Sequence, residues 1–277
     1  MNEYMSELIY GPAILFAPAG RAEIIPKAAQ RADMVIVDLE DGAGDVDREL
    51  AYKNIRESGL DPQRTIVRVV GPSDPNFCAD VEMVKSTPFT LVMVPKVLDS
   101  VPEILDGLDI IAMIETPQAV INIPQIAADP KVVGMFWGAE DLTHLLGGTH
   151  SRFLKDETKE GSYRDTMRLT RALMHIHAAA NGKFTIDAIH ADFHDEAGLY
   201  GEAVDAAHMG FAGTACIHPK QVDTVRRAYQ PESAQLEWAQ RVVEEAKNHP
   251  GAFKLDGQMI DAPLISQAQM IISRQPA

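Results

Sequence analysis

Two acidic residues follow apolar segments in the middle of the chain, at positions that suit a metal site. Glu115 comes directly after the apolar run 109–114, and Asp141 follows the run 132–137 after three intervening residues. If the two runs are neighbouring parallel strands, both carboxylates stand at the same edge of the sheet. Carboxylate oxygens with open water positions suit octahedral Mg²⁺ or Mn²⁺. The alternative is that each acid only begins a helix, where the helix dipole favours a carboxylate.

The neighbours of these acids favour a shared site. Thr116 and Pro117 already form an N-cap and first-turn pair, which leaves Glu115 for another role. Asp141 is the expected second ligand because Glu115 ends the preceding strand. Glu140 is then a supporting or helix-opening residue.

Three cations stand inside other apolar runs or at their ends. Arg68 lies within such a run, so a surface position suits it less than it suits Arg21. A guanidinium group binds a carboxylate or a phosphate at two points, although a surface ion pair is the commoner role of a single arginine. Lys96 allows two interpretations. It is either the amine of a Schiff-base aldolase or the partner of Glu40 or Asp41 in an ion pair.

The elements that must position these residues alternate along the chain. Strand-like runs separated by helical patterns predict a parallel α/β fold, and eight of them predict a TIM (β/α)8 barrel. The runner-up is an open doubly wound sheet, but the turn PAGRAE lacks the Gly-x-Gly-x-x-Gly fingerprint of dinucleotide binding. The runs are 13–19, 34–39, 65–70, 90–94, 109–114, 132–137, 184–189 and 211–217, with helical patterns at 22–32, 47–58, 168–180 and 195–209.

The last fifty residues exceed what a barrel needs. We therefore expect a barrel domain at 1–228 and a C-terminal helical extension at 229–277, with helices over 231–248 and 264–272. Such an extension commonly packs on a neighbouring subunit or covers a site. The alternative is that it merely caps the barrel.

Composition narrows the class of protein. The chain has 277 residues, and 25 basic against 40 acidic residues give a formal charge of −15. No Lys/Arg cluster marks a nucleic-acid partner, although local arginines could still bind an anionic substrate.

The two cysteines, Cys78 and Cys216, have no metal-ligand spacing and suit reduced thiols. The N-terminus lacks the basic region of a signal peptide, and no apolar run reaches the roughly 20 residues that span a bilayer. We expect a soluble cytoplasmic protein with no membrane partner.

Several motifs together resemble the citrate lyase beta-subunit-like family of the HpcH/HpaI aldolase group. The resemblance covers nearly the whole chain and implies a (β/α)8 barrel, usually a homotrimer, that cleaves or forms a carbon–carbon bond in an acyl-CoA thioester. The matching stretches are LFAPAGR (15–21), MVIVDLEDG (34–42), VRVVG (67–71), VPK (94–96), AMIET (112–116), GAEDL (138–142), CIHPKQV (216–222) and GQMIDAP (257–263).

The resemblance also implies roles for single residues. Glu115 and Asp141 resemble the Mg²⁺ ligands, and Arg68 resembles the catalytic arginine that faces the substrate carboxylate and the developing enolate. Asp261 resembles a catalytic aspartate that the tail of a neighbouring subunit contributes. The residues expected at the substrate are Arg21, Arg68, Glu40, Glu115, Gly138 and Ala139, the last two because they are small and leave room for a keto acid.

Two departures from the family pattern bear on the substrate. Gly20 stands where the family usually has an acid or Asn, and the segment GPSDPNF (71–77) lacks the Asn common at that turn. Both lie near the expected substrate, so they affect its identity more than the type of reaction.

The expected function is a Mg²⁺-dependent lyase. Its substrate would be a 3-hydroxyacyl-CoA thioester of the malyl-, citramalyl- or citryl-CoA type, cleaved to acetyl-CoA and an α-keto acid. Mg²⁺ would bind the hydroxyl and carboxylate oxygens, Arg68 would offset the enolate charge, and Asp261 would transfer a proton at the acetyl carbon. The alternatives are a class II aldolase acting on free 2-keto acids and the beta subunit of a citrate lyase complex with an acyl-carrier partner.

Overall fold

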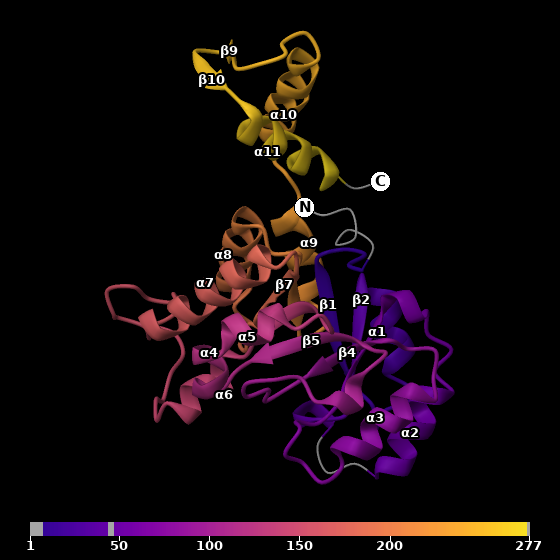
Figure 1. Ribbon diagram of the computed structural model, residues 1–277. Helices are drawn as coiled ribbons and strands as arrows, with labels where there is room; N and C mark the ends of the chain where they lie inside the picture. Colours follow the sequence, from indigo (N-terminus) through magenta and orange to yellow (C-terminus); the bar gives the residue numbers. More distant parts are fainter. Residues whose placement is uncertain (1–7, 44–46, 276–277) are drawn as a thin grey trace. The chain divides into compact units, whose positions relative to one another are not determined.

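A closed barrel of eight parallel strands forms the larger part of the chain (Figure 1). The structure is a computed structural model that describes residues 8–43 and 47–275. The strands follow one another in sequence order, and β1 pairs with β8 to close the barrel. The predicted TIM barrel is therefore confirmed, and an open doubly wound sheet is excluded. The strands are β1 Ala13–Pro18, β2 Met34–Asp38, β3 Thr65–Arg68, β4 Leu91–Val94, β5 Asp109–Ile114, β6 Val132–Trp137, β7 Phe184–Asp187 and β8 Gly213–Cys216.

Helices connect the strands and begin where the local sequence allows. Asp47 caps α2 by accepting hydrogen bonds from the backbone N–H groups of Glu49 and Leu50. Thr116 caps α4 in the same way, as predicted. Gly182, just past the end of α7, has a φ of 68°, which glycine adopts without a steric penalty. The helices of this part are α1 Ile25–Arg31, α2 Arg48–Arg56, α3 Phe77–Lys85, α4 Pro117–Ile121, α5 Ile123–Ala128, α6 Ala139–Leu145, α7 Asp165–Ala180, α8 Glu196–Met209 and α9 Gln221–Tyr229.

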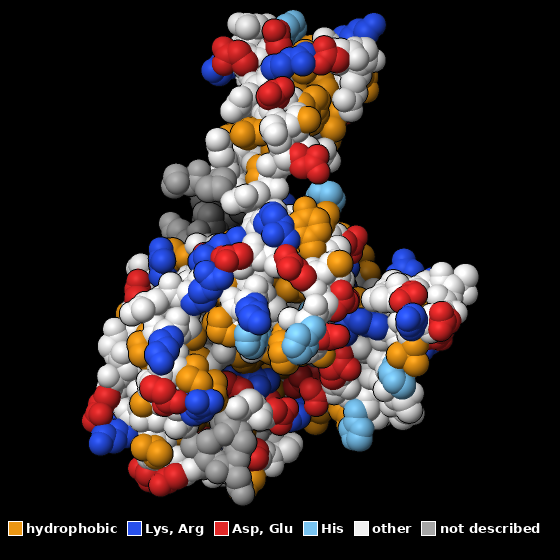
Figure 2. Space-filling model, turned by 180° about the vertical axis from the view of Figure 1, so that it is seen from behind, with side chains coloured by type: hydrophobic (Ala, Val, Ile, Leu, Met, Phe, Trp, Pro, Cys, Tyr) orange, Lys and Arg blue, Asp and Glu red, His pale blue; other side chains and the backbone are white. Residues whose placement is uncertain are grey.

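The surface carries charges of both signs. On the face shown in Figure 2, Lys and Arg side chains are interspersed with Asp and Glu side chains. This face therefore offers no continuous basic surface of the kind that nucleic acid requires. Among the described residues, no helix combines the length and the apolar character that a membrane crossing demands.

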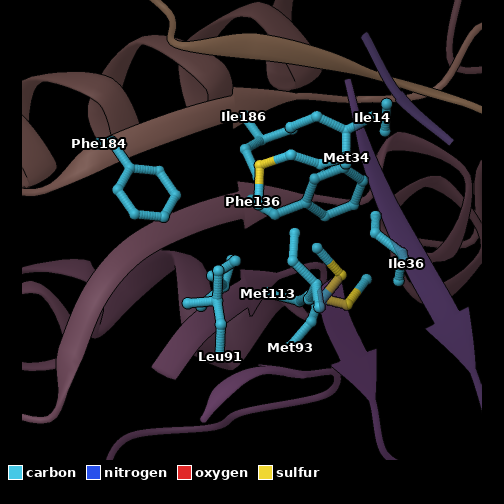
Figure 3. Packing of buried hydrophobic residues seen from close by; sticks show 12 residues of the cluster. Ile14, Met34, Ile36, Leu91, Met93, Met113, Phe136, Phe184 and Ile186 are labelled. Atoms are coloured by element: carbon cyan, nitrogen blue, oxygen red, sulfur yellow. The ribbon is translucent and has the colours of Figure 1, made fainter. Parts of the chain in front are cut away.

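Interior side chains from the strands fill the barrel. Met34, Met93 and Met113 lie close to Phe136 in this cluster (Figure 3). Methionine is unbranched and adapts to irregular gaps, so it suits the space between the strands. Gly134 on β6 makes room for a larger neighbour, because a Cβ atom at this position would lie 2.2 Å from the ring of Phe184.

Substitution of Gly134 tests this packing. Gly134→Ala is expected to destabilise the barrel by roughly 3 kcal/mol, because overpacking a dense core forces the neighbouring ring and backbone to shift. Gly201→Ala is the matched control. Gly201 lies inside α8, and a Cβ there would meet no atom within 4 Å. The control should raise stability by about 0.5–1 kcal/mol. Denaturant unfolding measures both, and equal free energies of unfolding for the two variants would contradict the packing described.

The C-terminal residues form a second compact unit. Contacts divide the chain after Val225, and the unit from Arg226 onward has its own apolar cluster. Its elements are α10 Ser233–Ala246, β9 Phe253–Leu255, β10 Gln258–Ile260 and α11 Ala262–Ser273. The sequence predicts the two helices, whereas the antiparallel pair β9–β10 was not predicted. Asp256 and Gly257 join these strands with φ of 49° and 86°, as two-residue Asp-Gly hairpin turns require.

Candidate metal and substrate site

Glu115 and Asp141 lie at the ends of two neighbouring strands. Glu115 follows β5, and Asp141 lies in the first turn of α6, directly beyond β6. The Gly138 N–H donates to the carbonyl of Ile114 at 3.2 Å, which joins the two strand exits. Glu115 is only 2% exposed, whereas Asp141 is half-buried. The structure therefore brings the two predicted ligands to one place.

Gly138 makes this arrangement sterically feasible. A Cβ atom on Gly138 would lie 2.6 Å from Oε2 of Glu115 and 2.9 Å from its Cβ. Gly138 was expected to leave room for a keto acid. In the structure, the room beside Gly138 is occupied by the side chain of Glu115. Ala139 is buried in the first turn of α6.

The Glu115 carboxyl is buried near other acids, and the positive charge of Arg68 offsets their effect on its pKa only in part. Burial raises the pKa of this carboxyl to about 8, and the charges of Asp141 and Glu40 add to the rise. A hydrogen bond from the backbone N–H of Lys96 to Oε1, 2.8 Å long, opposes it only partly. A divalent cation between Glu115 and Asp141 would relieve this repulsion.

The donor set fits Mg²⁺. Within the described residues, no three His, Cys, Asp or Glu side chains converge as a ready cage for a metal. Two carboxylates therefore leave the other positions to water or to substrate oxygens. Mg²⁺ usually binds in this way, because it keeps several waters and takes one or two protein carboxylates.

This arrangement predicts a pH-dependent metal affinity. If Glu115 is a Mg²⁺ ligand, the ion must bind its ionised form, and a pKa of about 8 means that the ion would displace a proton below that pH. Affinity should fall roughly 20-fold between about pH 8.5 and pH 6.5. Isothermal titration in buffers of different ionisation enthalpy measures both the affinity and the proton release. An affinity that stays constant over this range would contradict the assignment of Glu115.

Arg68 is fixed at the same rim by a two-point ion pair. It ends β3, where its Nε lies 2.6 Å from Oδ1 of Asp38 and its Nη2 lies 2.7 Å from Oδ2. Its guanidinium lies 4.8 Å from the ring centre of Phe16. Its Nη1 lies 2.9 Å from Oε2 of Glu40. Such pairing holds a buried cation in one orientation.

Asp38 is the site residue that sequence reasoning missed. The sequence points to Glu40, whereas Asp38 is the main partner of Arg68. Asp38 also accepts hydrogen bonds from the backbone N–H groups of Glu40 and Gly42. No local pattern in the sequence points to Asp38, because its contact with Arg68 follows from strand register, in which Asp38 and Arg68 are paired positions of β2 and β3.

Lys96 forms an ion pair, which was one of its two predicted roles. Its Nζ contacts Oε1 of Glu40 and lies 3.7 Å from Oδ2 of Asp41. Burial alone would lower the pKa of Lys96, but the hydrogen bond and charge of Glu40 raise it. A raised pKa keeps the amine protonated and disfavours Schiff-base chemistry, which needs the neutral amine.

A cavity of about 680 Å³ lies beside these residues. Its walls include the ends of β2 and β3, the loop before α3 and the side chain of Lys96. Glu40 also lines it, and burial raises the pKa of Glu40 despite the opposing charges of Arg68 and Lys96. The lining residues are Leu39, Glu40, Asp41, Arg48, Val70, Gly71, Ser73, Asp74, Pro75, Asn76 and Lys96.

Both the sequence and the fold are similar to those of known proteins. The profile of the HpcH/HpaI aldolase/citrate lyase family matches residues 13–106 and 103–219. The chain belongs to this family. It is 41% identical over 266 residues to the citrate lyase subunit beta-like protein of Mycobacterium tuberculosis, covering 95% of each chain. The crystal structure of CitE from the same organism, in complex with magnesium, acetoacetate and coenzyme A, superposes with a TM-score of 0.88. It has 41% identity and covers 96% of this chain and 98% of that one.

Two other relatives carry different activities in their names. The (3S)-malyl-CoA thioesterase of Cereibacter sphaeroides is 30% identical, over 96% of this chain and 94% of its own length. The mitochondrial citramalyl-CoA lyase of Homo sapiens is 28% identical, over 94% of this chain and 84% of its own. Membership of the HpcH/HpaI family therefore does not distinguish between these reactions, and a choice between them must come from the residues of the site.

Arg21 and Glu140 have side-chain partners of their own in this structure. Arg21 has a side chain that is 62% exposed and pairs with Glu23 at 3.0 Å. Glu140 accepts hydrogen bonds from Ser151 and Arg152, both in the loop between α6 and α7, which supports a structural role.

Asp261 lies in the C-terminal unit. It is half-buried and stands at the N-cap of α11, where its side chain makes no capping hydrogen bond. The local fold of the tail therefore does not use this carboxylate as a helix cap.

Proposed function

We propose that this protein is a Mg²⁺-dependent carbon–carbon lyase of 3-hydroxyacyl-CoA thioesters. The substrate carries a carboxylate on the hydroxyl-bearing carbon, as in malyl-, citramalyl- and citryl-CoA, and the products are acetyl-CoA and an α-keto acid. The observation that carries the proposal is the Glu115–Asp141 pair beside the fixed cation Arg68. The relatives named for citramalyl-CoA and for complexes with magnesium and coenzyme A support it.

The residues divide the chemistry between them. Glu115 and Asp141 would hold Mg²⁺, which supplies Lewis-acid polarisation to the substrate oxygens. The 3-hydroxyl gives its proton to solvent water, the bond between C2 and C3 breaks, and the electron pair remains on C2 as a thioester enolate. Arg68 is permanently charged and offsets the negative charge of this enolate. Asp261 delivers a proton to C2 and so completes acetyl-CoA.

We also propose a cytoplasmic homotrimer in which residues 229–277 of one subunit pack on the barrel, 1–228, of the next. The unused capping position of Asp261 supports a role for this residue outside its own helix. The substrate-side residues of the proposal also include Arg21, Glu40, Gly138 and Ala139. The side chain of Arg21 would have to leave Glu23, its present partner, to contact the substrate.

Hydrolysis is the second candidate reaction. The similarity to a malyl-CoA thioesterase favours it, because the same charged rim could act on the thioester instead of the carbon–carbon bond. A class II aldolase acting on free keto acids and a complex-bound citrate lyase subunit are further alternatives within the family.

A panel of thioesters tests the proposal. Purified protein with Mg²⁺ is incubated with malyl-, citramalyl- or citryl-CoA, and products are identified by chromatography and mass spectrometry. The lyase gives acetyl-CoA with glyoxylate, pyruvate or oxaloacetate. Free CoA with the intact hydroxy acid would show a thioesterase. Turnover that requires added partner subunits would show a complex component, and cleavage of free substrates only would show an aldolase.

A further inference from the structure

Lys96 has a backbone conformation that is unusual for a residue with a side chain. Its φ of 53° lies in the left-handed region, which glycine adopts far more readily. It sits in the turn after β4 and Pro95, opposite Gly71, where a Cβ atom would lie 3.1 Å from Cβ of Lys96. Strain of this kind persists where the surrounding structure requires it, and it clusters at functional positions.

Lys96 contacts two acids of the candidate site, one with each end of the residue. Its backbone N–H donates to Oε1 of Glu115 at 2.8 Å. Its ammonium group contacts Oε1 of Glu40. An uncharged residue with the same backbone would keep the first contact and lose the second.

The contact between the Lys96 ammonium group and Glu40 affects how strongly Glu40 interacts with Arg68. Glu40 is buried, with a side chain only 6% exposed, and its Oε2 faces Nη1 of Arg68 without a well-aligned hydrogen bond. A buried carboxylate needs a cation close by. Without Lys96, Arg68 would be the nearest cation left to Glu40. Arg68 would then neutralise Glu40 more fully and would interact less strongly with a substrate at the mouth of the barrel.

We infer that Lys96 is a positioning residue that balances the charge of Glu40 and so leaves Arg68 available to the substrate. Its left-handed turn holds Glu115 through the main chain at the same time. The inference rests on the proposed function, because it assigns Arg68 to the developing negative charge of the reaction.

Four variants test this role: Lys96→Met, Lys96→Arg, Glu40→Gln and the double variant K96M/E40Q. Lys96→Met should lower kcat/KM by about 20-fold or more, because Arg68 would then pair with Glu40 instead of with the substrate. Its affinity for Mg²⁺ without substrate should stay within about threefold of the wild type, because the backbone N–H to Glu115 remains. Lys96→Arg should retain most of the activity.

The double variant is the decisive comparison. Removing the carboxylate that Lys96 neutralises should restore about fivefold of the loss seen in Lys96→Met, a non-additive effect expected when two groups act through direct contact. Losses that multiply, or a Lys96→Met enzyme within about twofold of the wild type, would overturn the inference. A complete loss in both Lys96→Met and Lys96→Arg, with no rescue, would point to covalent catalysis and also overturn it.

A binding experiment separates this inference from the proposed function. If the wild type turned over no thioester, the lyase proposal would fail, but pyruvate binding in the presence of Mg²⁺ would still report on Arg68. Lys96→Met should then weaken pyruvate about tenfold at unchanged Mg²⁺ affinity. An unchanged affinity for pyruvate would overturn the role of Lys96.

Discussion

Replacing Glu115 with glutamine is expected to lower acetyl-CoA formation by about a thousandfold or more, because a ligand of the Lewis acid is lost. Glutamine keeps an oxygen that can accept the Lys96 N–H, so the local fold should survive. The unfolding temperature of the metal-free protein should stay equal or rise, since the substitution removes a buried acid that the charges of Asp141 and Glu40 repel.

Product formation and thermal unfolding of the metal-free protein measure the two effects of Glu115→Gln. Asp165→Asn is the matched control, because Asp165 has a side chain that is 79% exposed on α7 and pairs at the surface with Lys159 and Arg168. The control should leave both quantities unchanged. Turnover within about tenfold of the wild type in Glu115→Gln would remove this residue from the metal site.

Asp261→Asn is expected to lower turnover by about a hundred- to ten-thousandfold, the range typical of general acid–base groups. Binding of Mg²⁺ and of pyruvate should persist, because the barrel rim is intact. The helix should also persist, since the Asp261 side chain does not cap α11 and asparagine is itself a good capping residue. Steady-state kinetics together with calorimetry separate the chemical step from binding.

Mixing two inactive variants tests whether neighbouring subunits share the site. Glu115→Gln supplies an intact tail, and Asp261→Asn supplies an intact barrel. After joint refolding or co-expression in equal amounts, about a quarter of the sites of a symmetric trimer should combine both intact parts. Activity near that fraction is expected. No recovery, with mixed oligomers demonstrated, would show that the tail does not act on a neighbour.

The barrel could be predicted from the sequence because its signal is local. Strands β2, β3 and β4 are buried along their whole length, so apolar residues fill β4 and the interior positions of β2 and β3. The pairing of Glu115 with Asp141 followed from the same pattern, since consecutive strands of a barrel are neighbours. The Asp256-Gly257 hairpin was also encoded locally, but its three-residue strands are too short to stand out.

Register and side-chain direction were beyond the sequence. The choice of Asp38 over Glu40 as the main partner of Arg68 depends on the alignment of β2 with β3, which no local pattern fixes. The hydrogen bond from Arg152 to Glu140 depends on the path of the long loop between α6 and α7. The exposed position of Arg21 depends on a rotamer paired with Glu23, two residues away.

The most direct test of a metal-dependent lyase is product analysis with the purified full chain, before and after metal removal. The untreated protein with Mg²⁺ should convert citramalyl-CoA or a related thioester to acetyl-CoA and keto acid in equal amounts. Exhaustive chelation should abolish this conversion, and added Mg²⁺ should restore it in wild type but not in Glu115→Gln. Conversion that survives exhaustive chelation, or release of free CoA without keto acid, would contradict the assignment.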